Sequence, residues 1–209
     1  MAQGVWVKVF PPPPVVKPEL PGLGGWADIT AVMGSPKKHE YTDVDGVDWT
    51  AYKWTSNGSV TLTDGLIDTL VVGGGSGWDT RVASGHSGAT GMGGQILYGL
   101  TKLQPPGTFT IEVGVGGTAD GSAAGAAGGV SRIGTFSVGQ QGPGWHTTPM
   151  ASNLEAFETT ITGAPMKVSG VFSGATYGEG AGTASQALAG NRGQQGVVIV
   201  RVPRANAKA

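Results

Sequence analysis

The chain has 209 residues, including 39 glycines, six tryptophans and no cysteine, and its formal net charge at pH 7 is −1. A hydrophobic content of 39 % together with this low charge is atypical of a disordered chain, and no Gly-X-Y repeat indicates collagen. The balanced charge offers no basic stripe for nucleic acid, and no apolar run approaches the about 20 residues of a membrane-spanning helix. We therefore expect a domain of moderate size, with no nucleic-acid partner and no membrane insertion.

Residues 1–35 are predicted to form an extended, Pro-rich arm. Residues 4–10 alternate with the period of a β-strand, and the following proline run favours a stiff polyproline II spacer. Two interpretations stay open: the strand folds back onto its own domain, or it adds to the sheet of a partner. The candidate attachment residues of this arm are Trp6, Phe10, Pro11, Pro12, Pro13 and Pro14.

Residues 36–209 are predicted to form one glycine-rich, all-β domain, an antiparallel β-sandwich. Asp45-Gly46, Asn57-Gly58 and Asp64-Gly65 are typical of tight turns, and the last two predict a β-meander. The run Leu70–Val72 is apolar on both faces, which indicates a covered, central strand. The predicted strands are Trp49–Trp54, Leu66–Val72, Gln95–Leu100, Thr108–Val115, Val130–Val138, Met166–Phe172 and Val197–Val202.

Eight glycines precede residue 73, and the other 31 lie between Gly73 and Gly196. A polyproline II helix has three residues per turn, so glycine at every third position leaves one edge without side chains. Such edges would let extended, polyglycine-like rods pack closely, with flexible surface loops as the alternative. Intervals of three occur at Gly85, Gly88, Gly91 and Gly94, at Gly190, Gly193 and Gly196, at Gly125 and Gly128, and at Gly139 and Gly142.

The sequence supports no catalytic, cofactor-binding or metal site. The run from Gly73 to Gly77 lacks the third glycine of a dinucleotide loop. Neither the histidines nor the acidic residues have the spacing of a metal or glycosidase site. Asp43, Asp45 and Asp48 crowd one turn and could hold calcium, but a plain Asp-Gly hairpin explains them equally well.

Several aromatic and polar side chains stand alone among glycines, which favours their exposure. Exposed Trp and Tyr side chains stack on sugars or anchor protein interfaces; alternatively these residues cap the sandwich or fill an interface between identical subunits. The candidate surface contacts are Trp78, Arg81, His86, Trp145, His146 and Tyr177.

Four motifs occur in a particular order: Leu70–Gly75, Leu103–Gly117, Gly129–Gly134 and Gly193–Val202. Their order and spacing resemble the glycine-rich domain of tailed-bacteriophage tail and fibre proteins, and residues 27–61 also look like minor tail proteins of phages of actinobacteria. The resemblance covers about residues 26–202. One departure is that glycine gives way to Trp78–Arg81 where the family continues in glycine.

The resemblance implies a virion structural protein, made in the host cytoplasm and most consistent with a minor tail or tail-tip component. Expected partners are other virion proteins, further copies of the chain in a homotrimer, and a host-envelope glycan or protein. The alternatives are a capsid decoration or head-fibre protein, whose arm would bind the shell, and an envelope-glycan-degrading enzyme. No acid–base pair supports the enzyme, so we expect a non-enzymatic protein without a cofactor.

Overall fold

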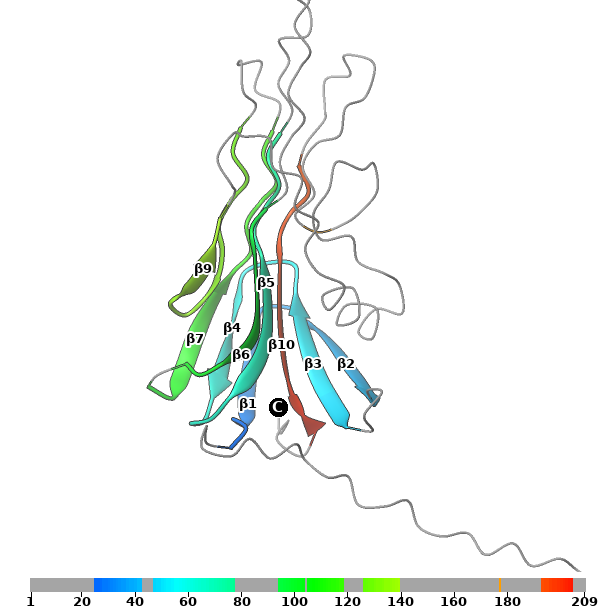
Figure 1. Ribbon diagram of the computed structural model, residues 1–209, viewed down its shortest axis with the longest axis vertical. Helices are drawn as coiled ribbons and strands as arrows, with labels where there is room; N and C mark the ends of the chain where they lie inside the picture. Colours follow the sequence, from blue (N-terminus) through cyan, green and yellow to red (C-terminus); the bar gives the residue numbers. More distant parts are fainter. Residues whose placement is uncertain are drawn as a thin grey trace, which may run out of the picture.

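The computed structural model describes residues 25–42, 47–77, 94–103, 105–118, 126–139, 177 and 193–204. Within these ranges the regular structure consists of β-strands, arranged as two antiparallel sheets (Figure 1). The predicted all-β, sandwich-like class is confirmed. The candidate arm residues Trp6, Phe10 and Pro11–Pro14 lie outside the described residues, as does the predicted strand Met166–Phe172.

In the described part of the chain, each sheet has five strands. Sheet one has the order β1-β4-β7-β8-β9 and sheet two the order β2-β3-β10-β5-β6. The strands are β1 (Ile29–Met33), β2 (Lys37–Thr42), β3 (Asp48–Trp54), β4 (Gly58–Leu62), β5 (Ile67–Val72), β6 (Ile96–Thr101), β7 (Gly107–Glu112), β8 (Ser131–Ile133), β9 (Phe136–Val138) and β10 (Val197–Pro203).

The main core lies between the two sheets. Alternate residues of each strand point inward, as period-two patterning requires. In β10, Val198, Val200 and Val202 belong to this core, and in β7 the buried Ile111 is flanked by Phe109. Trp54 is fully buried, and its indole nitrogen donates to the carbonyl of Met33 at 3.0 Å, which ties β3 of one sheet to β1 of the other.

Sheet two is buried on its outer face as well. Leu70 and Val72 of β5 and Val197 and Ile199 of β10 are 0 % exposed and form a second apolar cluster, against which Tyr177 packs. The prediction that Leu70–Val72 lies in a covered strand is confirmed, and β5 is paired on both sides. By contrast, the outer face of sheet one carries exposed threonines, including Thr108 and Thr110 of β7.

The predicted meander is wrong, because its two turns are corners between sheets. β3 pairs with β2 and β10, whereas β4 pairs with β1 and β7, so Asn57-Gly58 passes the chain from sheet two to sheet one. Asp64-Gly65 then returns it to β5 in sheet two. Among the described residues positive φ is confined to glycine, so Asn57 does not adopt the type I′ hairpin geometry. Its carboxamide oxygen instead accepts from the Val113 amide at 2.9 Å.

Three boundaries also differ from expectation. The stretch Val130–Val138 is a tight hairpin of β8 and β9, turning at Gly134 with φ +55°. β7 ends at Glu112 rather than Val115, because the chain there leaves the sheet for a different packing described below. β1 lies within the range 1–35 that was assigned to the arm, and it pairs with β4.

Candidate functional site

Beyond the sandwich, the glycine-rich segments continue the strands as extended chains that run side by side at one end of the molecule (Figure 1). We call this region the glycine bundle and each of its segments a rod. The bundle consists of residues 73–77, 94–95, 114–118, 126–129, 139 and 193–196.

The central rod, residues 73–77, donates its amides in several directions. The amides of Gly73, Gly74 and Gly75 bond the carbonyls of Gln95, Gly129 and Gln194, each at 2.9 Å. Three successive residues thus reach three different rods, which is the geometry of a helix with three residues per turn. Gly77, three residues after Gly74, returns to the same neighbouring rod by donating to Ala126.

The same interval of three recurs between the surrounding rods. Gly129 and Ala126 donate to the carbonyls of Val115 and Thr118, at 2.7 and 2.8 Å. On another side of residues 114–118, Gly196 and Gly193 donate to the carbonyls of Gly114 and Gly117, at 2.8 and 2.9 Å. In each case the two donor residues are three positions apart, and so are the two acceptor residues. The contacts therefore form a polyglycine II-like lattice rather than a β-ladder, whose period is two.

Glycine is required in the bundle because the rods lie too close for side chains. A Cβ added to Gly74 would lie 2.1 Å from the carbonyl oxygen of Val115, and one on Gly116 would lie 1.7 Å from that of Gly193. Equivalent additions at Gly94, Gly117, Gly128, Gly193 and Gly196 would come within 2.0 Å of a carbonyl oxygen. Positive φ is not the reason, since none of these glycines has it.

The prediction of packed glycine rods agrees with the described part of each period-three segment. Gly94, Gly128, Gly139, Gly193 and Gly196 all contact neighbouring backbone or side chains in the bundle. Gly85, Gly88, Gly91, Gly125, Gly142 and Gly190 lie outside the described residues. Sequence reasoning missed the role of residues 73–77 as the central rod; Gly74 and Gly77, three residues apart, were the available signal.

Of the candidate contact residues, only Tyr177 is described; Trp78, Arg81, His86, Trp145 and His146 lie outside the described residues. Tyr177 is half-buried against the outer cluster of sheet two, and the Lys53 ammonium lies 4.6 Å from its ring centroid. In the sequence, segments 78–93, 119–125 and 140–192 each connect two rods. At the end of the bundle away from the sandwich, Gly77 donates to the Ala126 carbonyl and Ala126 to that of Thr118, while Gly193 donates to the carbonyl of Gly117.

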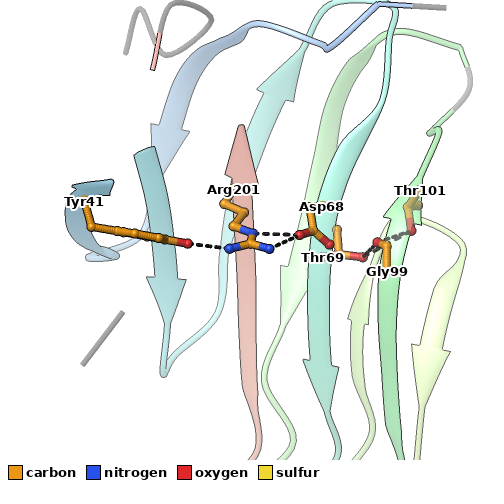
Figure 2. Close-up of polar contacts among 6 residues, drawn as sticks. All are labelled: Tyr41, Asp68, Thr69, Gly99, Thr101 and Arg201. Carbon is orange, nitrogen blue, oxygen red and sulfur yellow. Dashed lines mark hydrogen bonds and ion pairs between the residues drawn. The ribbon is translucent and has the colours of Figure 1, made fainter. Parts of the chain in front are cut away.

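A second polar arrangement crosses the outer face of sheet two, at the end of β10 away from the bundle (Figure 2). The Arg201 guanidinium donates to an Asp68 carboxylate oxygen through two nitrogens, both at 2.6 Å, and to the Tyr41 hydroxyl at 2.6 Å. Its planar group also lies 4.3 Å from the centroid of the Trp49 ring, which Trp26 meets edge-on. Arg201 therefore links four strands, which is a stabilising role.

Two ionisable groups on this face have displaced pKa values. Burial raises the pKa of the Asp68 carboxyl, although the adjacent Arg201 acts to lower it. Burial also lowers the pKa of His39, and the positive charges of Lys53 and Lys37 lower it further. The His39 Nε2 atom is buried and makes no hydrogen bond within the described structure. Sequence separation concealed the Arg201–Asp68 pair, since the partners are 133 positions apart in the chain.

The possible calcium turn is only partly described. Asp43 and Asp45 lie outside the described residues, whereas the Asp48 carboxylate accepts from the Thr42 hydroxyl and lies 3.7 Å from the Arg204 guanidinium. Within the described ranges, His, Cys, Asp and Glu residues form no group of three that could hold a metal ion.

No family model matches the chain, and no curated protein or solved structure matches it. In the part of the chain that the structure covers, no helix is long and apolar enough to cross a membrane.

Proposed function

We propose that the protein is a structural component of a bacteriophage virion, a minor tail or tail-tip protein that contributes to adhesion to the host surface. The proposal rests on the order and spacing of the four glycine-rich motifs. In the fold, these motifs correspond to the central rod with β5, to β7 with its rod, to β8, and to the last rod with β10.

The observation that carries the proposal is the glycine bundle. Its rods are cross-linked by backbone hydrogen bonds in more than one direction, so the bundle forms a stiff extension of the sandwich. Segments 78–93 and 140–192, which contain the candidate contacts Trp78, Trp145 and His146, are attached to this extension. A rigid support to which connecting segments are attached suits binding at an external surface, because binding residues are often carried on loops positioned by a rigid scaffold.

In this proposal the protein acts in the virion, tail favoured over capsid, with other virion proteins and further copies of itself, a homotrimer, as partners. A host-envelope glycan or protein is the proposed external ligand. The protein acts by binding, without an enzymatic step, cofactor or metal ion.

Gold-labelled antibody against the chain, applied to intact particles, tests the location. Label at the tail tip supports the proposal, label on the head instead supports a decoration or head-fibre protein, and unlabelled particles overturn a virion role. Adhesion is tested by competition, in which the purified protein should bind host cells and reduce infection. Turnover of isolated host-envelope glycan by the purified protein would establish the enzymatic alternative.

A further inference from the structure

Among the residues that the structure describes, the sandwich has four edge strands, and they differ in how readily they can accept another strand. An open edge presents unpaired backbone groups, and proteins protect it with charge, shortness or local distortion. The edges are β1 and β9 in sheet one and β2 and β6 in sheet two.

Two of the four edges are protected in simple ways. β2 carries charges at Lys37, Lys38 and Glu40 within six residues, and Lys38 and Glu40 form an ion pair at 3.1 Å. β9 has three residues, and the chain directly after it is tied to the other sheet, because the Gly139 carbonyl accepts from the Gln95 amide.

β6 is protected by a distortion. Gly99 has φ +125°, and its carbonyl accepts from the hydroxyls of Thr69 at 3.3 Å and Thr101 at 3.4 Å (Figure 2). A positive φ within a strand breaks the regular presentation of backbone groups, which makes the outer edge of β6 a poor template.

β1 is the least protected of these edges. Its five residues, Ile29–Met33, carry no charge; its register with β4 shifts once, between Ile29 and Ala31, and is regular from Ala31 to Met33. Thr30, Ala31 and Met33 are exposed, and Met33 is 68 % exposed, among the largest apolar exposures in the described structure. An added strand would cover this side chain and the outer backbone of β1.

We propose that residues 4–10 of a second copy of the chain add as a strand to the outer edge of β1. This segment has the alternation of a strand, with Val5, Val7 and Val9 on one face and Trp6 and Phe10 on the other. In this arrangement the valine face extends the inter-sheet core next to Val32, a residue that already packs against that core. The aromatic face then covers the exposed side chain of Met33.

The length of the proline-rich spacer favours pairing of residues 4–10 with β1 of a second copy over pairing with β1 of the same chain. Residues 11–21 contain six prolines and span about 34 Å as a polyproline II helix, at about 3.1 Å per residue. From Gly25 to the far end of β1 the chain covers about 27 Å, at about 3.4 Å per residue. A stiff spacer that folds back from Gly25 therefore carries residues 4–10 past the end of its own β1. The proposal does not depend on where the protein sits in a virion.

Cysteine cross-linking tests this strand pairing. The natural chain has no cysteine, so every disulfide that forms must involve an introduced residue. Trp6→Cys, Lys8→Cys and Phe10→Cys chains, altered on the face expected to lie beside Met33 and Ala31, are each mixed with a tagged Ala31→Cys chain and oxidised. We expect a disulfide-linked heterodimer for at least one pair, since opposed Cβ atoms in paired strands lie close enough to be bridged. Tagged Lys38→Cys on β2 and Ser137→Cys on β9 are the matched edge controls and should give no more than random cross-linking.

A Lys8→Cys/Ala31→Cys chain that closes its disulfide within one molecule, or cross-linking equal at all three edges, would overturn the proposal. Light scattering supplies an independent readout at the same edge. Ala31→Lys places a charge at an exposed position and should convert the oligomer to monomer, as should deletion of residues 1–10, whereas Ser137→Lys should not. A natural chain that is monomeric, or an Ala31→Lys variant that keeps its oligomeric mass, contradicts strand addition at β1.

Discussion

The sandwich and the glycine bundle are both built from extended chains, yet they are stabilised in different ways. In a sheet, backbone hydrogen bonds lie in one plane, so at least one face needs other groups to cover it. The protein meets this need with side chains: Trp54 and Ile111 fill the space between the sheets, and Leu70 and Ile199 cover the outer face of sheet two.

In the bundle, the three-residue turn sends successive hydrogen bonds to different neighbours, as Gly73, Gly74 and Gly75 show. The network is three-dimensional, so neighbouring backbones take the place of a side-chain core. Gly74, Gly75, Gly114 and Gly193 are buried although they have no side chain. The comparison teaches that a glycine-rich segment can be as specific in its packing as an apolar strand, provided that its glycines recur at the interval of its helix.

The largest effect should come from removing a side chain of the sandwich. Trp54→Ala deletes a fully buried indole and its bond to the Met33 carbonyl, and should lower the free energy of unfolding by about 4 kcal/mol. Guanidinium denaturation measures this change. Val115→Ala is the control from the bundle, because its side chain is 71 % exposed, and it should leave stability nearly unchanged.

The next largest loss of stability should come from breaking the Arg201–Asp68 ion pair on the outer face of sheet two. Arg201→Met leaves the buried Asp68 carboxylate without its partner, and should cost about 3 kcal/mol at pH 7. Because burial already raises the pKa of Asp68, the cost should shrink as the pH is lowered and the carboxyl becomes protonated. Denaturation at pH 7 and pH 5 checks both statements; an Arg201→Met/Asp68→Asn variant should be more stable than Arg201→Met alone.

A smaller effect, confined to the bundle, is expected from a single methyl group. Gly74→Ala places a Cβ 2.1 Å from the Val115 carbonyl oxygen, so the rods must separate at a cost of about 2 kcal/mol. Gly139→Ala is the matched control, since its added Cβ would meet only the Val130 side chain, at 3.5 Å. Amide exchange should accelerate at Gly129 and Gly193 in the first variant and stay slow in the second. Equal tolerance of both substitutions would contradict close packing of the rods.

The smallest effect should be a pH dependence from His39. Its lowered pKa means that the unfolded chain binds the proton more readily, so the stability that neutral His39 contributes is present above about pH 6.5 and is lost as the pH falls. His39→Gln should flatten the decline in unfolding free energy between pH 7.5 and 5.5. His86→Gln serves as the control; if it flattens the profile equally, the assignment to His39 fails.

Much of the fold follows from local pattern. The range Val197–Val202 was predicted as a strand, and β10 (Val197–Pro203) confirms it. The pairing of strands did not follow, because Asn57-Gly58 has the same residues whether it closes a hairpin or turns a corner between sheets. The choice depends on where β4 buries Val60 and Leu62, which is a long-range property.

The candidate site was predictable to a similar extent. The interval of three in Gly190, Gly193 and Gly196 indicated a rod, because that pattern is a property of the local helix. Which rods would be neighbours was not predictable, since Gly75 bonds Gln194 across more than a hundred residues. The Asp68–Arg201 pair was missed for the same reason: each residue is the only charged residue of its strand, and only the strand order brings them together.

Amide hydrogen exchange followed residue by residue by NMR tests the central claim, that backbone hydrogen bonds hold the glycine bundle in one structure. The account predicts that the amides of Gly73, Gly74, Gly75, Gly129, Gly193 and Gly196 exchange about as slowly as those of β5 and β10. Exchange of all six at the rate of an unstructured chain, while the strands remain protected, would contradict it.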